Sequence, residues 1–209
     1  MYSVKEIFYT LQGEGARAGR AAVFCRFAGC NLWSGREVDR ADASCDFCDT
    51  DFVGTDGPGG GRYERAEDLA QAVAQTWPRA QGSAPYVVFT GGEPLLQLDG
   101  EAVEACKRHG FEVAVETNGT IDPPPGIDWL TVSPKPESAL RVVRGQELKL
   151  VYPHAVTPES VAELEFPLFY LQPLDGPDLV ENTQRALEYC QQHPRWRLSL
   201  QLHKILDIP

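Results

Sequence analysis

The sequence is short of positive charge: its 209 residues include 19 Lys and Arg against 30 Asp and Glu, a formal net charge of −11. A chain this acidic has no electrostatic attraction for nucleic-acid phosphates or anionic lipid headgroups, so we expect neither as a partner. No apolar stretch approaches the roughly 20 residues that a membrane-spanning helix needs. The first residues also lack the apolar run of a secretory signal. We therefore expect a cytoplasmic protein that binds no membrane.

Cysteines are too few for a disulfide scaffold of this length, and a reducing compartment would keep them as thiols. The six cysteines are unevenly spread, because four of them lie within residues 25–48. Such clustering indicates a metal or cluster site. The hydrophobic content of 43% and the charged content of 23% are ordinary for a folded protein. Length and composition together predict one domain, residues 1–209, with a single core.

Short apolar segments alternate with segments of helical periodicity along the chain. We expect strands at residues 21–27, 86–89, 111–116, 129–133, 147–152, 168–171 and 197–203, and helices at 64–77, 101–109, 158–164 and 179–192. This alternation predicts an α/β fold with a mostly parallel sheet. A complete (β/α)₈ barrel needs about 250 residues, so this chain fits a partial, open TIM-like barrel better.

Polar and glycine-rich motifs follow directly after four of the predicted strands. They are residues 90–94 (TGGEP), 116–119 (ETNG), 133–135 (SPK) and 172–173 (QP). The carboxyl ends of parallel strands meet at one edge of a sheet, so we expect these motifs to converge on one site. Gly91 and Gly92 have no Cβ and let the backbone approach a ligand closely, although a tight turn would also need them.

Three cysteines have a spacing that suits a cluster: 14 residues separate Cys30 from Cys45, and two separate Cys45 from Cys48. Three thiolates suit an iron–sulfur cluster with one open iron, whereas four would suit structural zinc. Cys25 lies in the predicted strand 21–27 among apolar neighbours, so we interpret it as a buried core residue. The spacing therefore favours a three-cysteine cluster over a zinc module, and a protein without metal is the third alternative.

These motifs, in this order, resemble the radical S-adenosylmethionine (SAM) superfamily and, within it, the 7-carboxy-7-deazaguanine synthases. The resemblance runs from about residue 7 to the C-terminus. It rests on residues 11–15 (LQGEG), 26–32 (RFAGCNL), 45–50 (CDFCDT), 90–94, 116–119, 133–135 and 172–173. One departure is the spacing, because the superfamily usually has C-x3-C-x2-C. Residues 31–44 therefore form an inserted loop within the predicted domain.

The resemblance implies a radical SAM lyase with three cofactors. A [4Fe–4S] cluster would be bound by Cys30, Cys45 and Cys48, and SAM would bind its open iron. Mg²⁺ would be bound by Thr50, with Asp49 or Asp51 as alternatives. SAM would also be contacted by Phe47, Asp49, Gly91, Gly92, Glu93, Glu116, Asn118, Ser133, Lys135, Gln172 and Asp175. Ordinary structural roles are the alternative for some of these, such as loop capping by Glu93 or a solvated Lys135.

The implied substrate is 6-carboxy-5,6,7,8-tetrahydropterin, which the family converts to 7-carboxy-7-deazaguanine with loss of ammonia, in queuosine or 7-deazapurine biosynthesis. Arg26 is the candidate for the substrate carboxylate, because a guanidinium matches a carboxylate. Glu14 is the candidate acceptor for the amidine-like edge. The alternative for Arg26 is a structural salt bridge, for example with Glu14. His203, in the last predicted strand, is the third catalytic candidate. The remaining predicted substrate contacts are Leu11, Gln12, Gly13, Thr90 and Pro209.

The family also implies a homodimer and an electron donor such as flavodoxin, and the acidic charge neither requires nor excludes them. Two other functions stay open at this point. Another radical SAM reaction, such as activation of a glycyl-radical protein, shares the cysteines and TGGEP but leaves residues 11–15 unexplained. A structural zinc-binding module accounts for the cysteines but leaves residues 90–94 and 133–135 without a purpose.

Overall fold

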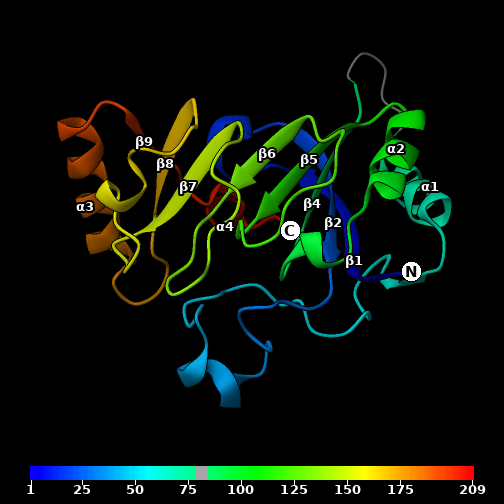
Figure 1. The fold of residues 1–209 in the computed structure, drawn as a ribbon, viewed down its shortest axis with the longest axis horizontal. Helices are drawn as coiled ribbons and strands as arrows, with labels where there is room; N and C mark the ends of the chain where they lie inside the picture. The colour runs from blue at the N-terminus through cyan, green and yellow to red at the C-terminus, as the bar shows by residue number, and fades with distance from the viewer. Residues whose placement is uncertain (79–83) are drawn as a thin grey trace.

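One nine-stranded sheet organises the computed structural model, which describes residues 1–78 and 84–209 (Figure 1). The strands are β1 (Tyr2–Leu11), β2 (Ala21–Phe27), β3 (Gly61–Tyr63), β4 (Tyr86–Gly91), β5 (Glu112–Thr117), β6 (Trp129–Val132), β7 (Glu147–Tyr152), β8 (Leu168–Pro173) and β9 (Trp196–Leu198). Their order across the sheet is β3-β1-β2-β4-β5-β6-β7-β8-β9. From β2 to β9 all neighbours pair in parallel, whereas β1 pairs antiparallel with β2 and β3. The edge strands β3 and β9 stay apart, so the predicted open, partial barrel is confirmed.

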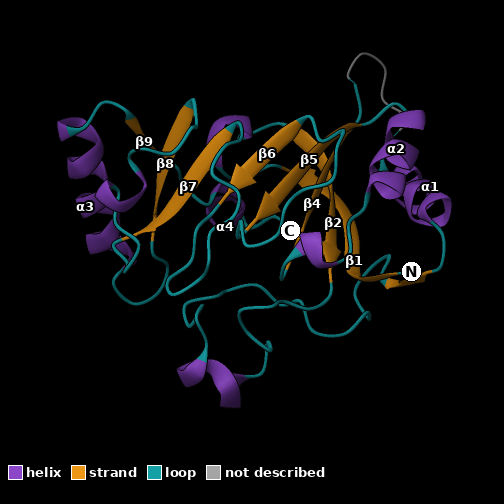
Figure 2. Cartoon of the chain, in the orientation of Figure 1, coloured by secondary structure: helices purple, strands orange, loops and turns teal. Residues whose placement is uncertain are grey.

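Helices cover the outer face of the sheet at its two ends (Figure 2). The α-helices are α1 (Ala66–Thr76), α2 (Gly100–Arg108), α3 (Leu179–Gln192) and α4 (Leu202–Leu206), and the 3-10 turns are η1 (Gly15–Arg17), η2 (Glu37–Asp42), η3 (Pro94–Leu96) and η4 (Glu159–Val161). α1 and α2 pack together beside β1 and β5, and α3 packs on β8 and β9. None of the helices in the described ranges is long and apolar enough to span a membrane.

Alternation along the strands separates a helix-facing core from the barrel interior. In β2, Val23, Cys25 and Phe27 are fully buried in the large core that also contains residues of α1 and α2. Phe24 lies on the opposite face, in a smaller interior cluster. The prediction that Cys25 is a core residue is therefore confirmed, and the interior face is left to carry polar groups at the strand ends.

Several predicted elements differ from the structure at the edges of the sheet. β1 was not predicted, and the helix expected at residues 158–164 is only the turn η4. The last predicted strand is wrong beyond Leu198, because the Leu202 N–H donates to the Gly13 carbonyl (3.0 Å) and the chain turns into α4. His203 therefore lies on a short helix beside the start of the chain rather than on a strand.

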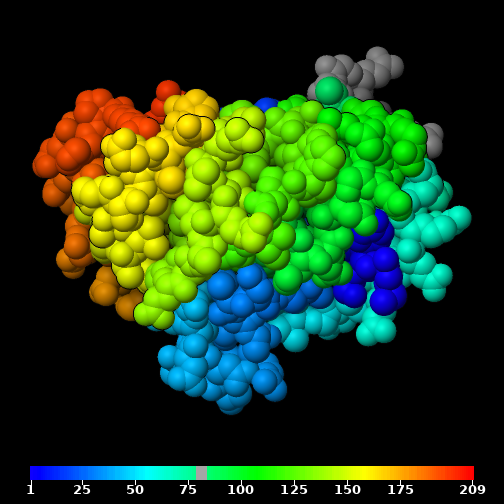
Figure 3. All heavy atoms as spheres, viewed as in Figure 1, coloured from blue at the N-terminus to red at the C-terminus, as the bar shows by residue number. Residues whose placement is uncertain are grey.

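The segment between β2 and β3 leaves the body of the molecule. It carries η2 at its tip and forms the blue lobe that projects from the surface in Figure 3. The same segment contains Cys45 and Cys48, and Cys30 lies just beyond the end of β2. The predicted cluster ligands thus lie where the irregular loop meets the carboxyl edge of the sheet.

Candidate active site

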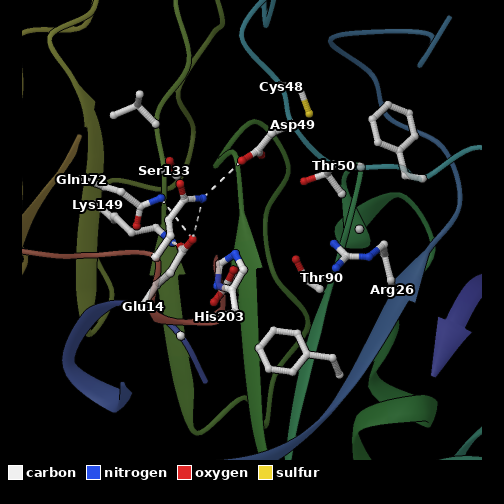
Figure 4. Close-up of a pocket in the computed structure, with 18 of the residues that line it drawn as sticks. Glu14, Arg26, Cys48, Asp49, Thr50, Thr90, Ser133, Lys149, Gln172 and His203 are labelled. Carbon is white, nitrogen blue, oxygen red and sulfur yellow. Dashed lines mark hydrogen bonds and ion pairs between the residues drawn. The ribbon is translucent and has the colours of Figure 1, made fainter. Parts of the chain in front are cut away.

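A pocket of about 600 Å³ opens at the carboxyl ends of the parallel strands. It is lined by residues from the start of the chain, the loop after β2, the ends of β4 to β8 and the segment after β9. Every predicted site residue lines this pocket except Glu93. In Figure 4, Glu14, Lys149 and Gln172 lie on one side, Arg26, Thr50 and Thr90 on the other, and His203 between them. The expected convergence of the strand-end motifs is therefore confirmed.

The three predicted cluster cysteines lie at this pocket with their sulfurs in polar surroundings. The Cys30 sulfur accepts from the backbone N–H of Leu32 at 3.4 Å. The Cys45 thiol donates to Cys48, and this hydrogen bond lowers the pKa of Cys48 to about 6. The thiolate is the form that binds metal, so Cys48 is the thiol of this pair that ionises more readily, whereas contact with Cys48 and burial raise the pKa of Cys45.

The arrangement of the thiols fits a cluster better than a single ion. Within residues 1–78 and 84–209, no group of three or more His, Cys, Asp or Glu side chains surrounds one metal position. A [4Fe–4S] cluster binds each thiolate at a different iron, so its ligands do not converge on one point. Cys25 is buried in the helix-facing core and does not line the pocket, so three thiolates are available rather than four.

The glycines of the TGGEP loop bring β4 against the end of β2. A Cβ on Gly91, where φ is +139°, would lie 2.3 Å from the Phe27 carbonyl oxygen. A Cβ on Gly92 would lie 2.3 Å from the Gly29 oxygen and 2.7 Å from the Cys30 Cβ. Both glycines therefore serve a close backbone approach that sets the position of Cys30.

Glu93 is held inside the protein rather than at the pocket. Its carboxylate accepts from the Leu95 N–H (3.0 Å), the Thr117 hydroxyl (2.7 Å) and the Asn118 N–H (2.8 Å). Burial raises the pKa of Glu93, while these hydrogen bonds oppose that shift. The contacts are those of a loop cap that joins the TGGEP loop to the end of β5.

The SPK and ETNG motifs supply polar groups at the ends of β6 and β5. The Lys135 amine donates to the carbonyl and the hydroxyl of Ser133, both at 2.7 Å, and lies 5.9 Å from the centre of the Phe47 ring. Burial lowers the pKa of Lys135, and the neighbouring thiols of Cys45 and Cys48 oppose this shift. Lys135 is therefore a placed pocket residue. Glu116 accepts from Gln12 at 2.9 Å, which links the LQGEG segment to β5.

A buried ion pair between Glu14 and Lys149 forms one wall of the pocket. The side chains are 13% and 8% exposed, and Glu14 also accepts from Gln172 (3.1 Å) and Gln201 (3.2 Å). Burial alone would raise the pKa of Glu14, but the Lys149 ammonium outweighs it and lowers that pKa. The pair therefore keeps Glu14 ionised, in the form that only accepts hydrogen bonds.

Sequence reasoning did not identify Lys149. A signal was present, because a lysine between two leucines in a buried strand needs a partner for its charge. Gln201 was not predicted as a site residue either.

On the opposite wall, Arg26 pairs with Glu6 rather than with Glu14. The two residues are directly opposite each other in the β1–β2 ladder, and Nε of Arg26 donates to Glu6 at 2.8 Å. The predicted alternative of a salt bridge at Arg26 is therefore confirmed, but its partner is Glu6 and not Glu14. Among the described residues this hydrogen bond uses Nε alone, which leaves the terminal nitrogens of the guanidinium for an anion in the pocket.

The end of the chain closes the pocket against the LQGEG segment. His203 packs so closely on Gly13 that a Cβ there would lie 2.4 Å from the imidazole Nδ1. The Thr10 hydroxyl donates to the Pro209 carbonyl at 2.7 Å. The structure thus brings together the predicted substrate contacts from both ends of the chain.

Each of the two aspartates that flank Thr50 forms an ion pair with a lysine. Lys204, which no motif indicated, lies 2.5 Å from Asp49 and 2.5 Å from Asp175, and it lowers the pKa of Asp175. Asp51 pairs with Lys5 at 3.0 Å. Thr50 lies between the two pairs and lines the pocket. Of the three groups considered for Mg²⁺, Thr50 is the one without an ion pair among the described residues.

Comparison with known proteins shows which family this chain resembles. Residues 39–197 match the family model described as the Radical SAM superfamily. The chain is 62% identical to a 7-carboxy-7-deazaguanine synthase of Bordetella pertussis over 100% of this chain and 99% of that protein. It is also 62% identical to one of Bradyrhizobium diazoefficiens over 99% of each protein.

Solved structures give the same result. A crystal structure of QueE from Escherichia coli matches with a TM-score of 0.70 and 26% identity, covering 97% of this chain and 94% of that chain. The glycyl-radical activase and zinc-module alternatives are not supported by these relatives. The chain belongs to the 7-carboxy-7-deazaguanine synthase family of radical SAM enzymes.

Proposed function

We propose that this enzyme converts 6-carboxy-5,6,7,8-tetrahydropterin to 7-carboxy-7-deazaguanine and ammonia, as a step of queuosine or 7-deazapurine biosynthesis. Substrate and product differ by one ammonia, so the conversion needs no net oxidant or reductant. The observation that carries the proposal is that one pocket joins three cysteines, the TGGEP loop and two opposed charged walls. The names of relatives that are 62% identical over the full chain support it further.

The donor set of the pocket fits the cofactors of this family. Cys30, Cys45 and Cys48 would hold the [4Fe–4S] cluster, and the fourth iron would be left for SAM. When bound, the cluster and SAM supply the radical that removes a hydrogen atom from the substrate. The side chains and backbone proposed to hold SAM are Phe47, Asp49, Gly91, Gly92, Glu116, Asn118, Ser133, Lys135, Gln172 and Asp175.

The two walls suit opposite ends of the substrate. Arg26 would receive the carboxylate through its terminal nitrogens, with Thr90 beside it. Glu14, kept ionised by Lys149, would accept from the amidine-like edge, because a carboxylate has about four lone-pair sites. His203, between the walls, would orient the substrate together with the LQGEG backbone. This arrangement holds the substrate in one orientation, which is the main contribution a protein makes to such a reaction.

Four further features belong to the same proposal. Mg²⁺ would bind Thr50 and take its remaining ligands from substrate and water, as this ion usually does. The other three features are a homodimer, an electron donor such as flavodoxin and a cytoplasmic location, and they rest on family membership and composition.

A product assay tests the proposal. The anaerobically reconstituted enzyme, with SAM, Mg²⁺ and a reductant, should release 7-carboxy-7-deazaguanine and ammonia in equal amounts from the carboxytetrahydropterin. Arg26→Leu should retain its iron and sulfide but lose most of the product, because the carboxylate then has no partner. A wild-type enzyme that carries the cluster and cleaves SAM but leaves this substrate unchanged would contradict the proposed reaction.

A further inference from the structure

The inserted loop has an internal structure of its own. Its Trp33 is 8% exposed and meets Phe52, which is 2% exposed, edge to face with ring centres 5.6 Å apart. η2 follows Trp33 and ends shortly before Cys45. An insertion of 14 residues costs little more in closure entropy than a short loop, but length alone would not order the cysteines it connects.

Arg40 connects this loop to the two cysteines that end it. Its Nη1 donates to the backbone carbonyls of Asp46 (2.6 Å) and Cys48 (3.1 Å). Its Nε donates to both carboxylate oxygens of Glu37, at 2.8 and 2.9 Å. Its Cζ lies 4.2 Å from the centre of the Trp33 ring. A planar guanidinium can make all these contacts at once, whereas an ammonium cannot.

The two acceptors of Arg40 lie within the Cys45–Cys48 turn. Carbonyl oxygens fixed at positions 46 and 48 restrict the backbone on both sides of Phe47 and hence the direction of the Cys48 side chain. The Cys45–Cys48 turn is therefore held by a side chain that lies outside it.

We propose that Arg40 is a positioning residue for the iron–sulfur cluster, and that the inserted loop acts as the support that presents Arg40 to the Cys45–Cys48 turn. This inference rests on the proposed cluster and extends it to a residue that no motif or relative's name assigns. Arg40 acts on the cluster through backbone carbonyls and not as a ligand. Its loss should leave the sheet intact and make the bound cluster easier to lose.

The test is the rate at which the reconstituted full-length enzyme releases iron to a chelator under anaerobic conditions. Arg40→Met should release iron about tenfold faster than wild type, since it loses charge-assisted hydrogen bonds to two carbonyls. Arg40→Lys should fall between the two, because it keeps the charge but not the planar fork. The midpoint of thermal unfolding, measured in parallel, should stay at the wild-type value.

Arg36→Met is the matched control. Arg36 lies in the same loop and pairs with Asp39, but its side chain is 70% exposed and makes no contact with the cysteine turn among the described residues. Iron release from this variant should equal that of wild type. The inference is wrong if Arg40→Met releases iron at the wild-type rate. It is also wrong if Arg36→Met releases iron as fast as Arg40→Met does.

A second variant covers the case in which Arg40→Met does not fold. Trp33→Leu removes the ring on which the guanidinium stacks and leaves Arg40 in place. Faster iron release from this variant supports the inference, and a wild-type rate overturns it. A wild-type enzyme that takes up no iron and sulfide would instead refute the proposed cluster, which keeps the two failures distinct.

Discussion

The two sides of the active-site pocket are stabilised in different ways. On the sheet side, Lys149 lies in β7, which pairs with β8 along its whole length, and it forms a buried ion pair with Glu14 in the turn after β1. On the loop side, Cys45 and Cys48 lie in a segment whose only regular element is the turn η2. Single polar side chains, the half-buried Arg40 and the exposed Lys204, hold this segment. We infer that the sheet side is preformed, whereas the loop side depends on a few separate polar contacts.

This difference predicts that damage to the sheet side costs folding stability, while damage to the loop side costs cofactor retention. Removing one member of a buried ion pair leaves the other charge buried without a partner, and this lowers the free energy of unfolding strongly. A loop outside the core can lose one contact without unfolding the sheet. The following variants are chosen to break or sharpen this contrast.

Lys149→Met should have the largest effect. It leaves the Glu14 carboxylate buried without its cation, and breaking such a pair typically costs about 3–5 kcal/mol. The free energy of unfolding, measured with urea, should fall by this amount, and product formation should be abolished. Lys107→Met removes an ion pair of 3.0 Å to Asp128 on the surface of α2 and should change neither quantity. Equal stabilities of the two variants would contradict a buried, essential pair.

Gly92→Ala tests the junction between the two sides. The new methyl group would meet the Gly29 carbonyl and the Cys30 Cβ, and such overpacking typically costs about 1–3 kcal/mol. We expect loss of bound iron with only a moderate fall in unfolding free energy. Gly100→Ala is the control, because a Cβ at Gly100 has no atom within 4 Å among the described residues. Full cluster content in Gly92→Ala would show that Cys30 does not depend on this close approach.

Acid should weaken the sheet side through the Glu14–Lys149 pair. The pKa of Glu14 is lowered in the folded state, so its contribution is complete above the ordinary glutamate pKa and is lost as the pH falls through the lower folded value. Each tenfold difference in proton affinity between the folded and unfolded states is worth about 1.4 kcal/mol. Urea unfolding of wild type and Glu14→Gln at pH 7 and pH 4 measures this, and wild type should lose more stability. Parallel losses would argue against an ionised Glu14.

Lys204→Met should have the smallest effect on folding stability, but it should weaken the binding of SAM measurably. Lys204 joins Asp49 on the loop side to Asp175 at the end of β8, so its loss frees two groups proposed to contact SAM. We expect the dissociation constant for SAM, from equilibrium dialysis with the reconstituted enzyme, to rise about tenfold. The unfolding free energy should stay near the wild-type value, because these carboxylates are partly exposed. An unchanged dissociation constant for SAM would show that Lys204 does not position these two aspartates for SAM.

The sequence predicts the regular elements of the sheet better than it predicts the contacts between distant residues. The bounds of β2, β7 and α3 agree with the predicted residues, because buried strands and an amphipathic helix carry a local periodic signal. The convergence of the strand-end motifs also followed from parallel topology. The partner of Glu14 could not be predicted in this way, because Lys149 is 135 residues away and only the three-dimensional fold brings the two together.

Other contacts escaped prediction for the same reason. Arg26 finds Glu6 through β1, a strand that was not predicted. Lys204 pairs with Asp49, which is 155 residues away in sequence, and it lies on the short helix α4, which was not predicted. Arg40 lies in an irregular loop, where no periodicity indicates which backbone groups a side chain will meet.

The most direct test of the account is an anaerobic analysis of iron, sulfide and zinc, with a visible absorption spectrum, on the reconstituted wild type and on Cys45→Ala. The account predicts about four irons and four sulfides per wild-type chain. It also predicts that the cluster absorption is lost in Cys45→Ala, while the unfolding free energy changes little. Stoichiometric zinc without sulfide in the wild type would contradict a cluster on the loop side of the pocket and the radical chemistry that depends on it.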